Sequence, residues 1–105
     1  MANVNHTFAS MSADEREKNL RLAAALRAHR AEVRRALKHG EIGIDEALGD
    51  PKCGGMRLRQ LLSALPHWGV KTAREWMEAN GINYAMRVRG LGVHQRELVA
   101  SIGRE

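Results

Sequence analysis

The stretch LPHWGVKTAREWMEANGI, residues 65–82, decides how this chain folds. Pro66 ends one helical pattern and Gly69 precedes the next, so the chain must turn sharply between two short amphipathic helices. Gly69 also allows another molecule to approach the backbone closely. His67 and Trp68 stand in this turn, where small residues are expected, so the turn is either a ligand contact or a buried corner.

The helix after this turn is predicted to span about residues 70–80, with Ala73 and Met77 inward and Gly81 as its left-handed stop. Its first N–H groups have no intrahelical partner, and together with the positive end of the helix dipole they form an anion site. The side chains that can surround this site are Lys71, Thr72 and Arg74. Backbone amides do not read base identity, so such a site binds phosphate without sequence preference.

A second candidate is RVRGLG, residues 87–92, where two arginines precede glycines that let the backbone approach a ligand before another helix begins. Two such helix N-termini could hold phosphates a few positions apart on a duplex. The alternative is two loops that are merely well capped. The residues predicted to contact DNA are His67, Trp68, Gly69, Val70, Lys71, Thr72, Arg74, Arg87, Arg89, Gly90, Leu91 and Gly92.

The rest of the chain also has helical patterns. Ser12, with Glu15 three residues later, predicts the start of a long helix over about residues 12–39, and Gly40 predicts its end. Its apolar stripe is Leu22, Leu26, Val33 and Leu37. Further helices are expected at residues 44–48, from about residue 57 with Leu58, Leu61, Leu62 and Leu65 buried, from Asn83 through Val88, and through Leu98, Val99 and Ile102.

No alternating strand pattern occurs, and aromatic residues make up only 4% of the chain. The expected fold is therefore all-α, with a long N-terminal helix packed on a compact set of shorter helices. With 105 residues, the chain has room for one domain. We expect this domain to cover residues 12–105, with the two-turn region at about 57–102, behind a flexible N-terminal arm of residues 1–11.

The formal net charge is +5, and 13 of the 17 basic residues are arginine, whose planar fork matches phosphate. Residues 57–104 carry eight basic and three acidic side chains, so the second half is expected to meet a polyanion. The long helix also carries basic residues in its C-terminal half. They are either a solvated face or a second DNA surface, and they comprise Arg27, Arg30, Arg34, Arg35 and Lys38.

Other functional classes find little support. Cys53 is the only cysteine, which excludes an intramolecular disulfide and predicts at most an exposed loop thiol. The histidines lack metal-ligand spacing, and no nucleophile has an assigned base, so we predict no metal, no cofactor and no enzymatic activity. No stretch resembles a membrane span or a signal peptide, and a cytoplasmic protein is expected. Trp76 is expected in the core, whereas Trp68 either covers the joint or touches DNA.

Three segments carry a resemblance to a known family: RAEVRRALKHGEIGIDEAL (30–48), MRLRQLLSALPHWGVKTAREWMEANGI (56–82) and RVRGLG (87–92). In this order and spacing the chain resembles the actinobacterial integration host factors over about residues 12–102. The resemblance implies an all-helical, helix-two-turns-helix protein of the nucleoid. It also implies duplex DNA binding through the backbone with little sequence specificity, bending and compaction of DNA, and in some cases assistance to a phage integrase. A monomer is expected.

The turn departs from the LPGVGK pattern typical of that family. This chain has His67, Trp68 and Val70 in place of glycine, valine and lysine, while a lysine follows at Lys71. If His67 must adopt a positive φ, a non-glycine there costs on the order of 1 kcal/mol or more. The departure concerns the affinity of this loop more than the fold. The alternatives to DNA binding are an adaptor for an integrase or another acidic partner, an RNA-binding module, and a fragment of a nuclease or glycosylase.

Overall fold

The computed structural model describes residues 12–104, and the predicted arm of residues 1–11 lies outside the described residues. The expected all-α class is confirmed: within this range there is no strand, only an isolated bridge between Arg57 and Arg87. The α-helices are α1 (Ala13–Lys38), α2 (Ile44–Leu48), α3 (Leu58–Leu62), α4 (Val70–Ala79) and α5 (Val93–Ser101). Short 3-10 helices are η2 (Pro51–Cys53), η3 (Val88–Gly90) and η4 (Ile102–Arg104).

Helix α1 begins and ends where its capping residues predict. The Ser12 hydroxyl accepts a hydrogen bond from the Glu15 N–H at 3.1 Å, which satisfies one of the free donors of the first turn. Gly40, one residue beyond the C-cap, has a φ of 69°, the left-handed conformation that stops a helix. At 26 residues α1 is about 39 Å long. It accounts for the elongated shape, which measures 59 × 27 × 23 Å.

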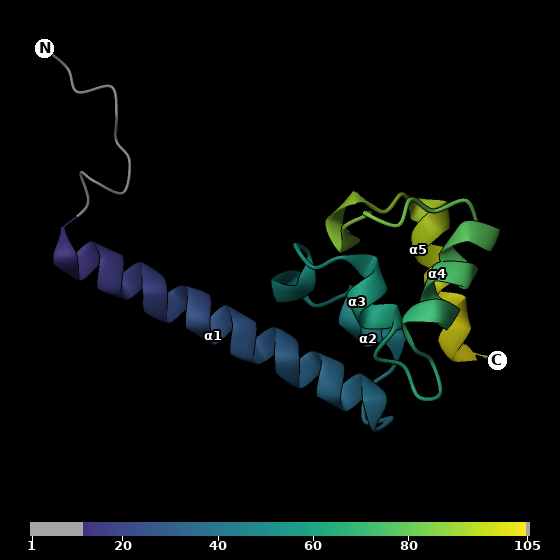
Figure 1. The fold of residues 1–105 in the computed structure, drawn as a ribbon, viewed down its shortest axis with the longest axis horizontal. Coiled ribbons are helices and arrows are strands. Elements are labelled where there is room, and N and C mark those ends of the chain that lie inside the picture. The colour runs from purple at the N-terminus through teal and green to yellow at the C-terminus, as the bar shows by residue number, and fades with distance from the viewer. Residues whose placement is uncertain (1–11, 105) are drawn as a thin grey trace, which may run out of the picture.

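Only the C-terminal half of α1 packs against the compact part, and this corrects the predicted stripe. Of the predicted stripe, Val33 and Leu37 are buried, Leu26 is half-buried and Leu22 is 60% exposed. The remaining helices are short, so they cover only the end of α1 nearest to them (Figure 1). The first half of α1 projects away from the compact part.

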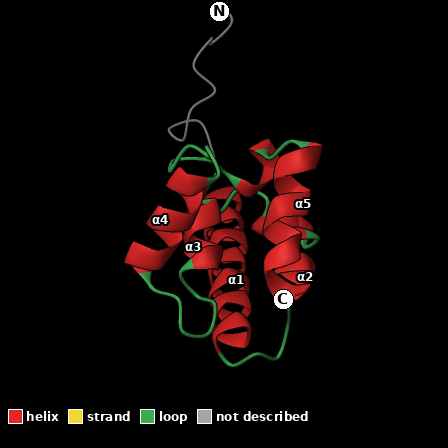
Figure 2. Cartoon of the chain, turned by 90° about the vertical axis from the view of Figure 1, so that its right-hand side faces the viewer, coloured by secondary structure: helices red, strands yellow, loops and turns green. Residues whose placement is uncertain are grey.

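The compact part consists of residues 44–104, with α3 packed on α4 and α2 packed on α5 (Figure 2). The predicted leucines of the third helix are buried, and so are Ala73 and Met77 of α4. Helix α3 ends at Leu62 and not at Pro66, where the sequence predicted its end. Leu65 therefore lies in the turn after α3, and it is buried there. Gly81 has a φ of 67°, which confirms it as the stop of α4. Leu98 of α5 is 41% exposed, and only its neighbour Val99 is fully buried.

No helix forms from Asn83 through Val88, contrary to the prediction. The Asn83 side chain accepts a hydrogen bond from the Ala85 N–H at 2.7 Å, which closes a tight turn. The chain then pairs with the segment before α3, because the Met86 carbonyl accepts from Leu58 N–H and Val88 N–H donates to the Met56 carbonyl, both at 2.9 Å. The backbone of this segment therefore forms these long-range hydrogen bonds in place of helical ones.

Cys53 is not the exposed thiol that its loop position predicted. The Asp50 carboxylate accepts a hydrogen bond from Lys52 N–H at 2.9 Å and caps the 3-10 turn η2, which directs Cys53 into the core. Burial raises the pKa of the Cys53 thiol, which opposes reactivity as a nucleophile. Among the described residues, no helix has both the length and the apolar character required to cross a membrane.

Candidate nucleic-acid interface

The N-terminus of α4 presents free backbone donors to solvent. Gly69 is the N-cap residue, its carbonyl accepts the first intrahelical bond from Ala73 N–H at 3.0 Å, and no side chain caps the end. The N–H groups of residues 70–72 precede that first bond and remain available. Val70 is 62% exposed, and Lys71 and Thr72 are exposed beside it. This is the geometry on which the predicted anion site depends, and anion binding here stays a prediction.

The N-terminus of α5 has the same plan. Gly92 is the N-cap, and the Arg96 N–H donates to its carbonyl at 2.9 Å. The Gln95 side chain accepts a hydrogen bond from the Gly92 N–H at 3.0 Å, which stabilises the start of the helix. The N–H groups of residues 93–95 precede the first intrahelical bond and are free in the same way.

Neither Gly69 nor Gly92 is required by the fold. Both backbones are extended, with φ values of −140° and −74°, which any residue adopts. A Cβ at Gly69 would meet no atom within 4 Å, and one at Gly92 only the Gln95 Oε1 at 3.8 Å. Gly40 and Gly81, by contrast, have the positive φ that favours glycine. The space next to Gly69 and Gly92 is therefore open toward solvent, where a ligand can approach the backbone.

The segment RVRGLG is held in place by the loop before α3. The Arg89 N–H donates to the Gly54 carbonyl at 2.9 Å, and the Arg87 guanidinium donates to the Gly55 carbonyl. Val88 is fully buried between them, and Leu91 is 8% exposed. Arg89 is left exposed. Of the predicted contacts in this segment, Leu91 can therefore take part only through its backbone.

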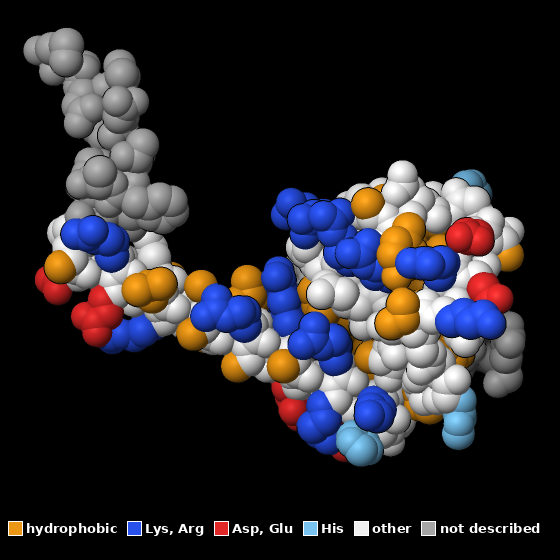
Figure 3. Space-filling model, viewed as in Figure 1, with side chains coloured by type: hydrophobic (Ala, Val, Ile, Leu, Met, Phe, Trp, Pro, Cys, Tyr) orange, Lys and Arg blue, Asp and Glu red, His pale blue; other side chains and the backbone are white. Residues whose placement is uncertain are grey.

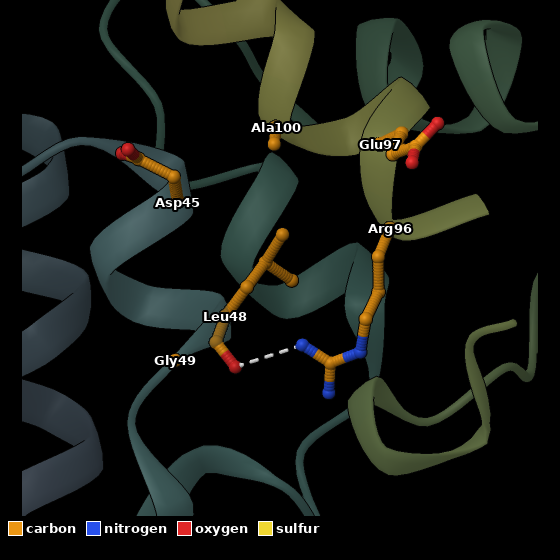
Figure 4. Close-up of a pocket in the computed structure, with 6 residues that line it drawn as sticks. All are labelled: Asp45, Leu48, Gly49, Arg96, Glu97 and Ala100. Atoms are coloured by element: carbon orange, nitrogen blue, oxygen red, sulfur yellow. Dashed lines mark hydrogen bonds between the residues drawn. The ribbon is translucent and has the colours of Figure 1, made fainter. Parts of the chain in front are cut away.

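The side chain of Arg96 braces α5 against α2. Its guanidinium donates to the Leu48 carbonyl at 3.2 Å across a hollow of about 260 Å³ (Figure 4). Figure 4 shows Arg96 directed to the end of α2, while Glu97 points away. This bond positions the first turn of α5, a role that the sequence did not predict.

A second unpredicted arrangement involves Tyr84, whose ring lies beside two guanidinium groups. The Cζ of Arg59 is 4.6 Å from the ring centroid and that of Arg74 is 4.9 Å. Arg59 also donates to the Tyr84 carbonyl at 3.3 Å. The electron-rich ring face attracts both cations and offsets their mutual repulsion. Tyr84 thus orients Arg74, one of the predicted contact residues.

Most basic side chains near the two helix N-termini have no acidic partner. In the described part of the chain, ion pairs join Arg21 to Glu17, His29 to Asp50, and Arg35 to Glu32 and Glu41. Arg57, Arg59, Arg87 and Arg96 donate instead to backbone carbonyls. A carbonyl fixes a guanidinium without cancelling its charge. Figure 3 shows basic side chains along α1 and across the adjacent side of the compact part.

The two N-termini are not brought together. Helix α4 begins at the lower end of the compact part and α5 at the upper end, in both views (Figures 1 and 2). His67, Lys71 and Thr72 therefore belong to one end of the compact part, and Arg87 and Arg89 to the other. Sequence spacing could not reveal this, because the direction of each helix depends on its tertiary packing.

The backbone of His67 has a positive φ, the conformation in which a non-glycine residue is strained. Its φ is 67°, and it is the one non-glycine residue with a positive φ among those described. The side chain is exposed. The turn is therefore left-handed at a residue that carries a Cβ, and the backbone of the histidine is strained. Trp68 is half-buried and packs against the core, which favours its interpretation as a cover for the joint.

The basic residues of α1 separate into two groups. Arg27, Arg30 and Arg34 line a hollow of about 280 Å³ together with Met56 and Gln60 of the neighbouring segment. Arg30 also donates to the Lys52 carbonyl at 2.8 Å. Arg35 faces Glu32 and Glu41, whose carboxylates raise its pKa and whose own pKa values it lowers. Its charge is therefore neutralised, while Lys38 stays exposed.

These features define an all-helical class in which two glycine-preceded helix N-termini face solvent among unpaired cations. The family model of the S13-like H2TH domain matches residues 31–101, from the middle of α1 to the end of α5. The integration host factor of Streptomyces coelicolor is 37% identical over 99 residues, 90% of each chain. Those of Mycolicibacterium smegmatis and Mycobacterium tuberculosis are each 38% identical over 88 residues, 80% of this chain and 84% of theirs.

One solved structure is described as "Structure of sIHF bound to an 8bp palindromic DNA". It matches with a TM-score of 0.74 and 36% sequence identity, covering 79% of this chain and 98% of that chain. The chain belongs to the actinobacterial integration host factor family. This confirms the resemblance seen in the sequence, and membership of this family agrees with the prediction that the protein is not an enzyme.

Proposed function

We propose that this protein binds double-stranded DNA through the phosphate backbone with little sequence specificity. The observation that carries the proposal is the pair of helix N-termini at Gly69 and Gly92, whose first-turn N–H groups face solvent at positions where a Cβ would find space. Free N–H donors and the helix dipole favour a phosphate there. A backbone amide does not distinguish bases, which accounts for the expected lack of sequence preference.

The surrounding charges support the same ligand. Lys71 and Thr72 would hold one phosphate group together with the amides after Gly69, with Arg74 and His67 beside them. Arg87 and Arg89, with the backbone from Gly90 to Gly92, would hold another. A structural relative at 36% identity is described as bound to DNA. A double helix is a better match to these two distant sites than a small anion, because it presents phosphates along its whole length.

We further propose that the protein bends and compacts DNA in the nucleoid, as the family resemblance implies. Two sites at opposite ends of the compact part would require one duplex to curve around it, or would each take a different duplex. The hollow lined by Arg27, Arg30 and Arg34 would provide a further contact. A bent duplex would also assist a phage integrase. We expect a cytoplasmic monomer, which sedimentation equilibrium would check.

The first experiment is binding to duplex DNA, single-stranded DNA and duplex RNA at several salt concentrations. If four to six phosphates are neutralised, the slope of log affinity against log salt is expected to be about −4 to −5. A slope near zero would exclude backbone binding. Tighter binding to duplex RNA would favour the RNA-binding alternative. Capture of an integrase without affinity for duplex DNA would favour the adaptor.

Single variants test the two sites. Lys71→Ala and Arg89→Ala each remove an exposed charge, and each is expected to weaken binding to all sequences alike and to reduce the salt slope by about one. Arg87 is less suitable, because its guanidinium also holds the Gly55 carbonyl. Lys18→Ala is the matched control, since it removes the same charge from the projecting half of α1. Equal losses in all three variants would contradict a localised site.

Compaction requires a separate test. The double variant Arg27→Ala/Arg34→Ala is expected to bind a short duplex within about threefold of wild type but to condense long DNA less, as measured by light scattering. Arg35→Ala is the matched control, because Glu32 and Glu41 already neutralise this arginine. Undiminished condensation by the double variant would exclude α1 as a second DNA surface.

A further inference from the structure

Three metal-ligating side chains from two separate segments converge at the junction of α1 and η2. They are His29 of α1, and Asp50 and Cys53 of the loop that contains η2. Their ligand atoms, a ring nitrogen, a carboxylate oxygen and the thiol sulfur, all lie within 4.8 Å of one another. His29 Nε2 and Asp50 Oδ2 are 2.6 Å apart. This cluster could not be predicted from residue spacing, because His29 lies more than twenty positions before Asp50 and Cys53 in the chain.

The backbone around the cluster is held by hydrogen bonds. Asp50 Oδ1 accepts from the Lys52 N–H at 2.9 Å, so its other oxygen is directed toward His29. The Cys53 N–H donates to the Asp50 carbonyl at 2.9 Å. From α1, Arg30 donates to the Lys52 carbonyl at 2.8 Å and fixes the loop against the helix. Bonds of this kind orient ligands in established metal sites.

The donor set and its dimensions fit zinc. Zn²⁺ takes thiolate, imidazole and carboxylate ligands at about 2.0–2.3 Å, so ligand atoms in a tetrahedral site lie on the order of 3.5 Å apart. Atoms that already lie within 4.8 Å reach that geometry with small side-chain rotations. A thiolate and a carboxylate also balance the charge of a dication. We propose that His29, Asp50 and Cys53 bind one Zn²⁺, with a water molecule as the fourth ligand.

The exposed edges of His29 and Asp50 give a metal ion access to the site, and the hydrogen bond between these two side chains must break when the ion binds. Cys53 is fully buried, but the side chains of His29 and Asp50 are 36% and 22% exposed, so the ion would enter from their side. Binding replaces the hydrogen bond between His29 and Asp50 and displaces the proton of the Cys53 thiol. In the metal-free protein this hydrogen bond joins His29 to Asp50. In the zinc-bound protein the ion would join all three side chains.

The position of the cluster indicates what the metal would do. It joins α1 to the loop whose next residues, Gly54 and Gly55, accept hydrogen bonds from the Arg89 backbone and the Arg87 side chain. An ion that binds only the folded state stabilises it by mass action. Zinc would therefore act as a structural clamp between α1 and the segment that carries RVRGLG.

The test is a titration of the full-length, metal-free protein with Co²⁺, a coloured substitute for Zn²⁺. We expect saturation at one equivalent, a thiolate-to-cobalt charge-transfer band, and loss of that band when Zn²⁺ is added. Zn²⁺ in excess over its dissociation constant is expected to raise Tm by about 4 °C or more. Binding without a charge-transfer band, or no binding at micromolar metal, would overturn the proposal.

Variants assign the ligands. His29→Gln and Asp50→Asn are expected to weaken Co²⁺ binding at least tenfold while circular dichroism shows unchanged helicity. His39→Gln is the matched control, since His39 is an exposed histidine at the end of the same helix. Cys53→Ser should abolish the band; if this buried position does not tolerate serine, the wild-type band and the two other variants decide. Equal weakening by His39→Gln would indicate surface binding and refute the site. None of these measurements involves DNA.

Discussion

The indole rings of Trp68 and Trp76 lie with their centroids 6.4 Å apart and their planes tilted by 55°. Tilted aromatic pairs at this separation attract each other beyond the burial of their surface. Trp68 also lines a hollow of about 250 Å³ with Leu65 and Ile102, and so covers the joint between α3 and α4. The tryptophan that interrupts the expected small turn therefore belongs to the packing of the domain.

Trp68→Ala is accordingly expected to reduce the free energy of unfolding by about 2 kcal/mol, because it removes a half-buried aromatic side chain and its partner contact. Urea denaturation measures this change. The DNA affinity of the folded variant is expected to equal that of wild type, and Trp68→Phe should recover most of the stability. A loss of affinity with unchanged stability would show instead that the ring contacts DNA.

Gly69→Ser separates stability from binding at the N-terminus of α4. Serine is at least as good an N-cap as glycine, and the backbone conformation and open space at this position accept a side chain, so stability should be unchanged or higher. The new side chain would cover or bond the free amides, and DNA affinity should fall about tenfold. Thermal melts and a binding titration measure the two effects. Unchanged affinity would exclude this helix end as a phosphate site.

His67→Gly tests the strained turn. Because His67 has a φ of 67°, glycine there should increase the free energy of unfolding by about 1 kcal/mol. His67→Ala is the control: alanine meets the same backbone strain, so no gain is expected. Chemical denaturation of the three proteins gives the comparison. If both substitutions raised the free energy of unfolding equally, the imidazole side chain and not the backbone conformation would be the source of the strain.

Much of the fold could be predicted from local chemistry. Ser12 and Gly40 bound α1, and the leucines at 58, 61 and 62 are buried, because capping and periodicity act over a few residues. The failure at residues 83–88 has a tertiary cause. There the backbone of Met86 and Val88 finds partners about thirty positions earlier in the chain, and no local pattern reports such pairing.

The local features of the candidate site could be predicted from the sequence, but their arrangement in space could not. The two helix ends were identified from glycines and flanking charges, but their placement at opposite ends of the compact part depends on packing. The stack of Arg59 and Arg74 on Tyr84, and the convergence of His29 with Cys53, join residues that are ten to twenty-five positions apart. Long-range proximity of this kind leaves no periodic signal in a single sequence.

Two leucines of α1 provide a matched test of how much of this helix packs. Leu37 is fully buried, so Leu37→Ala is expected to cost about 2–5 kcal/mol of stability. Leu22 is 60% exposed on the projecting half, so Leu22→Ala should change stability by less than about 0.5 kcal/mol. Denaturant melts of both variants measure the difference. A large cost at Leu22 would mean that the projecting half has a packing partner in solution.

Substitutions of Tyr84 test whether its ring positions Arg59 and Arg74. Tyr84→Leu keeps an apolar side chain but removes the ring face that lies 4.6 Å from Arg59 Cζ and 4.9 Å from Arg74 Cζ. We expect a loss of about 1 kcal/mol in stability and a roughly threefold loss of DNA affinity, because the two cations then repel each other and Arg74 is no longer held. Tyr84→Phe retains the ring and should match wild type in both measurements. Adding Arg74→Ala to each protein should lower affinity in wild type more than in the leucine variant, and equal effects in the two backgrounds would show that Tyr84 does not orient Arg74.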